Sequence, residues 1–253
     1  MFALERQKKI LELLEQKGSV KVSNLSTILS VTEETVRRDL EKLEKQEALR
    51  RTHGGAVPMD ETTYELSLEK RKATNIEAKQ KLAEVALSHI VSGDTIFLDA
   101  STTTFFIAKG LKKRNNITVI TNSLRVVAEL STTPEIKTIA VGGIVSENQS
   151  FIGSLAESSI RHNYVANKMF FSSKGITAEA GILESNEKEC GIKQQMLKNS
   201  GVKFYLCDSS KLGRIGFVKL CAFDEIDYFI SDAEPPAGFA QKLGDSEVKI
   251  IVS

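Results

Sequence analysis

Seven short apolar runs, spread from residue 95 to the end of the chain, constrain the fold more than any other feature of the sequence. They are rich in Val, Ile and Phe, and amphipathic segments separate them. Such runs are typical of strands that are buried on both faces, and the segments between them have the character of crossover helices. We therefore expect an α/β domain with a mainly parallel sheet. Its strands should cover residues 95–98, 117–120, 137–141, 168–171, 202–207, 228–230 and 248–252.

Polar or glycine residues follow the first six of these runs directly. In an open parallel sheet, ligands bind in the crevice beyond the carboxyl ends of the strands. A single Ser, Asn or Gly at such a point is usually a helix cap or a turn residue, but six polar ends together favour a binding site. The residues expected at this site are Asp99, Ser101, Thr102, Thr103, Thr104, Thr121, Asn122, Ser123, Gly142, Gly143, Lys174, Gly175, Asn186, Glu187, Asp208 and Lys211.

The hydroxyl-rich run at residues 101–104 opens a predicted amphipathic helix. Free backbone N–H groups, hydroxyl groups and the positive end of the helix dipole coincide there, which predicts an oxyanion site, with phosphate as the expected anion. A nucleotide P-loop is not supported, because the run has no Gly-x-x-x-x-Gly-Lys pattern. Lys174 and Lys211 would add positive charge. Acceptors for sugar hydroxyls are expected at Asp208, Asn186 and Glu187.

The first 57 residues follow a different pattern, with three helices and then a basic hairpin. A first helix ends at Gly18, and a second covers residues 22–29 with Ile28 among its inward residues. A third begins after Thr32, whose hydroxyl can cap it, and carries an apolar stripe at i, i+4 and i+7. Three helices in this order, followed by a hairpin with a glycine turn, predict a winged helix-turn-helix.

The outer face of the third helix is basic, and so is the hairpin. Two adjacent arginines on an isolated surface helix are more often solvated, but the surrounding helix-turn-helix pattern favours DNA contact. We expect this helix to enter a major groove, with Thr35 and Arg38 nearest the base edges, and the hairpin to contact the backbone or the minor groove. The expected contact residues are Lys21, Thr32, Glu34, Thr35, Arg37, Arg38, Lys42, Arg50, Arg51, His53 and Gly54.

Charge and composition limit the other possibilities. The formal net charge is +1, and residues 1–57 hold 11 basic against 9 acidic residues, so DNA binding would depend on local arginines and on doubled contacts in a dimer, and would weaken with salt. The chain lacks a long apolar stretch and a signal-peptide pattern, which predicts a cytoplasmic protein with no membrane partner. The three cysteines should be buried free thiols, and neither a metal nor a cofactor is expected.

The motifs of both halves resemble one family. In the first half they are Glu5-Arg6, Val36-Arg37-Arg38-Asp39-Leu40 and His53-Gly54-Gly55-Ala56, and in the second Asp99-Ala100-x-Thr-Thr, Thr121-Asn122-Ser123, Gly142-Gly143, Asn186-Glu187 and Asp208-Ser-Ser-Lys211. They resemble the DeoR family of bacterial transcriptional regulators, with one departure at Ser101, where many members carry glycine. The resemblance implies a winged helix-turn-helix at residues 1–57, a linker at 58–63, and a sugar-phosphate-sensing domain at 64–253. That domain is similar in fold to ribose-5-phosphate isomerase and the coenzyme A transferases.

Three classes of function remain to be compared. The first is a transcriptional regulator, specifically a repressor of a carbohydrate operon, that binds a double-stranded DNA operator as a homodimer or homotetramer and responds to a phosphorylated sugar. The second is a phosphosugar isomerase or transferase, with Glu187 or Asp208 as general base and Lys174 as electrostatic stabiliser. A purely architectural DNA binder is disfavoured, because the polar strand ends would then have no role.

Overall fold

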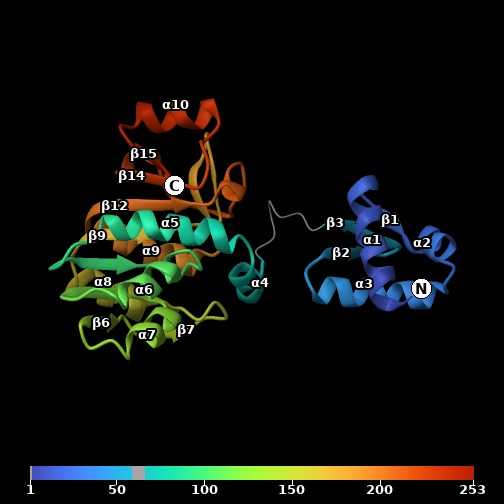
Figure 1. The fold of residues 1–253 in the computed structure, drawn as a ribbon, viewed down its shortest axis with the longest axis horizontal. Helices are drawn as coiled ribbons and strands as arrows, with labels where there is room; N and C mark the ends of the chain where they lie inside the picture. The colour runs from blue at the N-terminus through green and yellow to red at the C-terminus, as the bar shows by residue number, and fades with distance from the viewer. Residues whose placement is uncertain (1, 59–65) are drawn as a thin grey trace. The chain divides into compact units, whose positions relative to one another are not determined.

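The computed structural model describes residues 2–58 and 66–253, which form two compact units divided between Leu66 and Ser67. Each unit is described by itself (Figure 1). Of the predicted linker at residues 58–63, only Pro58 lies within the described residues.

The first unit is a winged helix-turn-helix. Gly18 ends the first helix in the left-handed conformation (φ 67°), and Thr32 caps the third by accepting a hydrogen bond from the backbone N–H of Thr35, as predicted. The hairpin strands pair with a short first strand in the antiparallel order β1-β3-β2. The elements are α1 (Ala3–Lys17), β1 (Val20–Lys21), α2 (Val22–Leu29), α3 (Glu33–Lys45), β2 (Leu49–Thr52) and β3 (Gly55–Pro58).

One apolar core holds the three helices and the hairpin together. The i, i+4, i+7 stripe of α3 is fully buried there, as predicted. The prediction for Ile28 is wrong: its side chain is 50% exposed, because Leu25 and Leu29 already fill the inward face of the two-turn helix α2. The core residues are Ile10, Leu14, Val20, Val22, Leu25, Leu29, Val36, Leu40, Leu43, Leu49 and Ala56.

The second unit is built on a seven-stranded sheet, in which every neighbouring pair is parallel. All seven apolar runs form its strands, which confirms the predicted fold class. The order is β15-β14-β12-β9-β4-β5-β6. The strands are β4 (Thr95–Leu98), β5 (Ile117–Thr121), β6 (Ile136–Ala140), β9 (Ala166–Phe171), β12 (Ser200–Cys207), β14 (Tyr228–Ser231) and β15 (Lys249–Val252).

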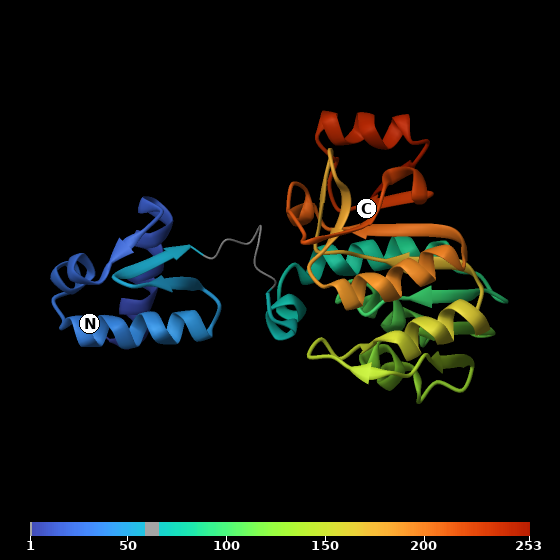
Figure 2. The ribbon, with the colours of Figure 1, turned by 180° about the vertical axis from the view of Figure 1, so that it is seen from behind.

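Helices cover both faces of this sheet. Helices α5, α6 and α7 share one apolar cluster with one face, and α8, α9 and α10 share a second cluster with the other. Figure 1 views the side of α5 and α6, and Figure 2 shows the side of α8 and α9 from behind. The helices are α4 (Leu68–Ala73), α5 (Ile76–Ser88), α6 (Thr104–Leu111), α7 (Leu124–Leu130), α8 (Ser154–Asn163), α9 (Glu187–Lys198) and α10 (Ala237–Asp245).

Several short elements were not predicted, because two to four residues are too few to show a period in the sequence. A hairpin joins β7 (Ile144–Val145) to β8 (Phe151–Ile152), and an antiparallel sheet contains β10 (Gly175–Thr177), β11 (Gly181–Glu184) and β13 (Val218–Cys221). The second unit also contains two short 3-10 helices, η1 (Ser209–Lys211) and η2 (Phe223–Glu225). Among the helices of the described ranges, none is both long and apolar enough to cross a bilayer.

Candidate functional site

The outward face of α3 carries exposed arginines. Arg37 and Arg38 keep 54% and 73% of their side chains exposed, and each pairs one turn back, with Glu33 (2.6 Å) and Glu34 (3.2 Å) respectively. Exposed i, i+4 ion pairs contribute only about 0.3–0.5 kcal/mol. A phosphate group can therefore displace either glutamate at small cost.

The next residue of the same motif faces inward. Asp39 is buried and accepts hydrogen bonds from Arg6 Nε (2.5 Å) and Gln7 Nε2 (3.2 Å), both on α1. The Arg-Arg-Asp sequence is thus divided between two roles. Its arginines lie on the exposed face of α3, and its aspartate fixes that helix to α1.

Backbone and side-chain hydrogen bonds hold the wing against the helices. Arg51 donates from its backbone N (2.9 Å) and from Nε (2.7 Å) to the two carboxylate oxygens of Glu44 on α3, and the carbonyl of Gly54 accepts the backbone N–H of Val22 (2.9 Å). A Cβ atom on Gly55 would lie 1.8 Å from the carbonyl oxygen of Val20, so β3 can approach β1 only with glycine there.

All the predicted DNA contacts lie at the surface of this unit except Thr35, which is half-buried with its hydroxyl 2.9 Å from that of Thr32. A hollow of about 570 Å³ between α3 and the wing is lined in part by Arg37, Arg51 and His53. The exposed residues are Lys21, Thr32, Glu34, Arg37, Arg38, Lys42, Arg50, Arg51, His53 and Gly54.

In the second unit the polar strand ends meet where the chain reverses its direction across the sheet. From β4 the chain proceeds outward through β5 to β6, and from β9 it proceeds the other way through β12 and β14 to β15. The carboxyl ends of β4 and β9 therefore flank the topological switch point, which is the usual position of a ligand crevice in open α/β sheets.

Asp99 connects the two loops at this point. Its Oδ1 accepts the backbone N–H of Ser101 (3.1 Å) and the hydroxyl of Thr104 (2.8 Å), and its Oδ2 accepts the backbone N–H of Ser172 (3.2 Å) and lies 2.9 Å from Lys193 Nζ. Burial alone would raise the pKa of Asp99, but the charge of Lys193 and these hydrogen bonds hold it below its ordinary value. Asp99 is an organising carboxylate with its acceptor positions filled.

Lys193 was not predicted from the sequence. It lies on the buried face of α9, where Nζ contacts Glu184 Oε1 (2.5 Å) and the carbonyl of Ser172 (2.6 Å) in addition to Asp99. Burial would lower its pKa, but the charges of the two carboxylates outweigh it and raise the pKa. This ion cluster fixes α9 and β11 to the ends of β4 and β9.

The end of β12 joins the same network. Lys211 Nζ donates to Ser172 Oγ (2.5 Å) and lies 3.7 Å from Asp208 Oδ2. Asp208 also accepts Asn75 Nδ2 (3.0 Å), from the residue just before α5. The structure therefore brings together the predicted residues that follow β4 and β12, and adds Ser172 and Asn75.

Further cations, also absent from the sequence prediction, surround this network. Lys79 is buried on α5 and donates to the carbonyls of Arg71 (2.5 Å) and Thr74 (2.7 Å). Burial, followed by repulsion from Lys211, Arg71 and Arg125 that Asp208 only partly offsets, lowers the pKa of Lys79 to about 8. These residues belong to helices that precede or follow other strands, so only the fold brings them together.

The predicted residues after β5 are buried in the next loop of the sheet. Thr121 Oγ1 accepts the backbone N–H of Ser123 (3.0 Å), and the Ser123 hydroxyl caps α7. Asn122 Nδ2 donates to the carbonyl of Phe151 (3.3 Å). These contacts shape the loop around the Asn122 side chain.

The glycine pair follows the edge strand β6, two strands away from β4. Gly142 (φ 73°) and Gly143 (φ 119°) both adopt positive φ, and a Cβ on Gly143 would lie 2.8 Å from the carbonyl oxygen of Ile152. Glycine is therefore required here for the backbone turn into the β7–β8 hairpin.

The remaining predicted residues lie around β10 and α9. A Cβ on Gly175 would lie 2.3 Å from the carbonyl oxygen of Arg214, and half-buried Lys174 donates its backbone N–H to Leu183. Asn186 caps α9 through its side-chain oxygen, and Glu187 is exposed.

Two glutamates close to the start of α9 in the sequence, Glu184 and Glu189, are buried. Glu184 contacts Lys193, and Glu189 accepts the Ser150 hydroxyl (2.5 Å). Glu187 of this segment was predicted as an acceptor, because the phase of a weakly amphipathic helix does not show which of its glutamates are buried.

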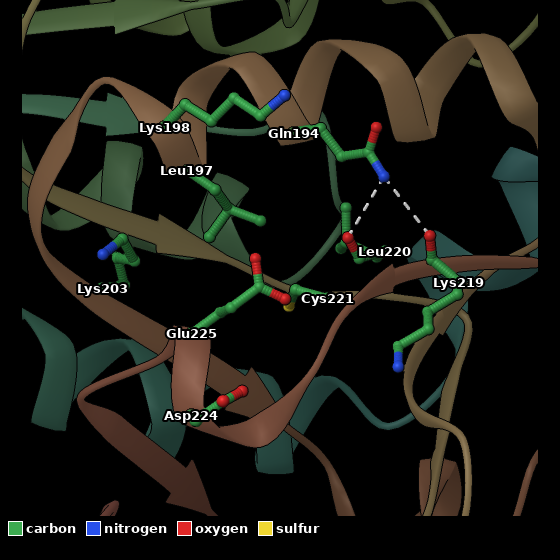
Figure 3. Close-up of a pocket in the computed structure, with 9 residues that line it drawn as sticks. All are labelled: Gln194, Leu197, Lys198, Lys203, Lys219, Leu220, Cys221, Asp224 and Glu225. Carbon is green, nitrogen blue, oxygen red and sulfur yellow. Dashed lines mark hydrogen bonds between the residues drawn. The ribbon is translucent and has the colours of Figure 1, made fainter.

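A separate pocket of about 600 Å³ lies between α9, β12, β13 and η2 (Figure 3). Gln194 reaches across it from α9 and donates to the carbonyls of Lys219 (3.4 Å) and Leu220 (3.3 Å). The nine lining residues include none of those predicted from the sequence, and Lys203 lies in β12 well before its carboxyl end. We assign the candidate site to the strand ends and not to this pocket.

Within the described residues, no group of three or more His, Cys, Asp or Glu side chains could hold a metal ion. Cys190, Cys207 and Cys221 are buried free thiols, as predicted, and burial raises the pKa of each.

A winged head with exposed arginines and a parallel sheet with a buried charged network at its switch point fit a two-part transcription regulator. Residues 6–62 match the DeoR-like helix-turn-helix domain, and residues 74–233 match the DeoR C terminal sensor domain. The chain belongs to the DeoR family of transcriptional regulators.

Relatives match along almost the whole length. The chain is 41% identical to the uncharacterised HTH-type transcriptional regulator YulB of Bacillus subtilis, over 99% of this chain and 96% of that protein. It is 33% identical to the HTH-type transcriptional repressor GlcR of Bacillus subtilis, over 100% of this chain and 97% of that protein. It is 29% identical to the glycerol-3-phosphate regulon repressor of Escherichia coli, over 97% of each chain. A ribose-5-phosphate isomerase in complex with phospho-erythronic acid aligns with a TM-score of 0.41 and 14% identity over 54% of this chain and 53% of that one.

Proposed function

We propose that this regulator represses an operon of carbohydrate metabolism and that a phosphorylated sugar modulates its binding to the operator. The network that joins the ends of β4, β9 and β12 through Asp99, Ser172 and Lys211 is the main support for an effector site. The names of GlcR and of the glycerol-3-phosphate regulon repressor support repression and a phosphorylated effector.

In this proposal α3 enters the major groove of the operator. Arg38, the more exposed of the two arginines, contacts a base edge, and Arg37 contacts a phosphate. Arg50 of the wing reaches the backbone, while Arg51 stays on Glu44 and fixes the angle between wing and helix. Operators of such regulators are read as half-sites by symmetric assemblies, so we propose a homodimer or homotetramer.

The effector site is proposed at the switch point. The phosphate lies at the N-terminus of α6, beside the hydroxyls of residues 101–104 and near Lys211, and the sugar hydroxyls meet the polar groups after β5 and β12. Binding favours an arrangement in which the two heads no longer match the half-site spacing. A coupling free energy of about 1–3 kcal/mol is sufficient for this.

An isomerase needs a carboxylate that can take a carbon-bound proton near neutral pH. Burial raises the pKa of Asp208, but Lys211 and the hydrogen bonds from Ser210 and Asn75 outweigh it and hold the pKa below its ordinary value. The other candidate base, Glu187, is exposed. Both features favour binding over turnover, in keeping with relatives that are transcriptional regulators.

The test is a titration of operator binding. Duplexes selected from genomic fragments by the purified chain are labelled, and anisotropy is recorded with and without phosphorylated sugars and their unphosphorylated counterparts. We expect release only with phosphate esters, and loss of the response in Thr103→Val and Lys211→Ala. If phosphate esters bind the chain but leave operator affinity unchanged, the switch mechanism is wrong. Turnover of ribose or fructose phosphates would instead favour the enzyme.

A further inference from the structure

Arg125, near the start of α7, is a cation in an unusual environment. Its Nη1 is buried and has no hydrogen-bond partner within the part of the chain that the structure describes. Its guanidinium carbon lies 4.0 Å from the centroid of the Phe105 ring on α6. Buried polar groups in folded proteins are nearly always paired, so an unpaired guanidinium N–H indicates a partner supplied from outside the chain.

Two other unpaired polar atoms belong to the same pair of neighbouring loops. They are Thr103 Oγ1, just before α6, and Asn122 Oδ1, just after β5, and both residues are fully buried. β4 and β5 are adjacent in the sheet, and the contact between Arg125 and Phe105 joins the first turns of α6 and α7. Among the described residues, the one other atom of this kind is Thr138 Oγ1, in the edge strand β6.

Positive charge predominates around these loops. The charges of Arg71 and Arg125 both act on Lys79, as does that of Lys211. The carboxylates that oppose them are Asp208 and Glu69, and Glu69 is also paired with Lys72 (2.6 Å). Asp99, at the start of the first loop, is paired with Lys193 (2.9 Å). Burial of like charges is unfavourable, and an anion with two negative charges relieves it most effectively.

The chemistry of the three unpaired atoms specifies the ligand further. Arg125 Nη1 can only donate a hydrogen bond, and the Thr103 hydroxyl can donate one, so both suit an anionic oxygen. Asn122 Oδ1 can only accept, so it needs a donor such as a hydroxyl group. One molecule that satisfies all three atoms carries both a phosphate group and a hydroxyl group.

We propose that Arg125 is a direct ligand of the effector phosphate, together with the Thr103 hydroxyl, and that Asn122 Oδ1 accepts a hydrogen bond from a hydroxyl of the same molecule. The ligand class is a hydroxylated phosphate monoester. This inference rests on the proposed function, and it assigns phosphate recognition to a side chain outside the hydroxyl run and Lys211.

The test is isothermal titration of the full-length chain with inorganic phosphate, glycerol 3-phosphate and glucose 6-phosphate. Arg125→Met should weaken binding of every phosphate compound at least tenfold, and Arg125→Lys should weaken it less, because it keeps the charge. Arg114→Met, which removes an exposed arginine three residues after α6, should change nothing. Asn122→Ala should reduce the preference for a monoester over inorganic phosphate.

A second measurement separates binding from structure. Because Arg125 lies among like charges with an unpaired donor, Arg125→Met should leave the melting temperature of the ligand-free chain unchanged or raise it. A lower melting temperature would make Arg125 a structural residue and overturn the inference. Full phosphate affinity in Arg125→Met, with loss in Lys211→Ala, would overturn it while leaving the proposed function intact. If no phosphate compound binds the wild-type chain, the proposed function fails as well.

Discussion

The two units use lysine and arginine in opposite ways. In the head, Arg37 and Arg38 are exposed and each pairs with one glutamate a turn away. In the sheet unit, Lys193 is 5% exposed and contacts two carboxylates and a carbonyl, and Lys79 is 4% exposed. The first arrangement suits a partner that brings its own dense charge, as DNA does. The second holds loops and helices together at the strand ends, beside the place where we propose that the effector binds.

This difference has consequences for selectivity. Exposed arginines gain affinity mainly by counterion release, so their contribution falls with salt and depends little on the shape of the partner. Salt screens buried cations less, and such cations bind tightly only a ligand whose charges match their fixed positions. A regulator needs both properties, in separate places.

The largest expected effect is on the stability of the sheet unit. Lys193→Met leaves Asp99 and Glu184 buried without their cation, which should lower its free energy of unfolding by about 3–5 kcal/mol. Urea unfolding followed by circular dichroism measures the change. Lys188→Met, on the exposed side of the same helix, is the matched control and should have almost no effect. Equal stability of the two variants would mean that the buried cluster does not hold this unit together.

The next effect concerns the wing. Gly55→Ala places a methyl group against the carbonyl of Val20 and should destabilise the head by roughly 3 kcal/mol, with loss of operator binding. Gly54→Ala is the control, since a Cβ there meets nothing within 4 Å. Hydrogen exchange measured by mass spectrometry should show lost protection at β1 and β3 in the first variant alone. Retained protection in Gly55→Ala would contradict the close approach of these strands.

The third effect is on DNA affinity without loss of stability. Arg38→Ala should weaken operator binding about tenfold or more and reduce discrimination at one base pair. Arg51→Ala should also weaken binding, but through a misplaced wing, so Glu44→Gln should reproduce part of its effect. Anisotropy titrations against operator and scrambled duplexes distinguish the two. The assignment of Arg38 to a base edge fails if its loss weakens both duplexes equally.

The smallest effect comes from the surface pairs on α3. Glu33→Gln removes the partner of Arg37 and should reduce head stability by about 0.3–0.5 kcal/mol. It should strengthen non-specific DNA binding at low salt, because Arg37 then binds a phosphate without first breaking its ion pair with Glu33. DNA binding is titrated for Glu33→Gln and for the wild type, at about 50 and about 200 mM salt. If the two proteins give the same curve at each salt concentration, this ion pair does not compete with DNA.

Local patterns predicted the strands and the outward face of α3, because a buried strand or an amphipathic helix records its environment in consecutive residues. The roles of Lys193 and Lys79 could not be predicted in this way. Lys193 contacts groups at the ends of β4 and β9, which are distant in the sequence. Lys79 donates to carbonyls just before its own helix, but its burial and the cations near it appear only in the folded unit.

The motif residues show the same limit. Asp99 was selected as a ligand residue, and the structure gives it four protein partners that organise two loops. Gly142 and Gly143 were selected for the same site, and their positive φ angles account for them as turn residues after an edge strand. A polar residue or a glycine at a strand end thus predicts where that residue lies in the fold, but it does not predict whether the residue binds a ligand or shapes a loop.

The central claim is that operator binding and anion binding belong to different residues of one chain. The most direct test compares Arg38→Ala with Lys211→Ala in two measurements. Operator binding is titrated by anisotropy with and without an active phosphate ester, and binding of the ester itself is measured by calorimetry. We expect Arg38→Ala to lose operator affinity and keep ester binding, and Lys211→Ala to keep operator affinity and lose both ester binding and release. A folded Lys211→Ala protein that no longer binds its operator, or an Arg38→Ala protein that no longer binds the ester, would contradict the account.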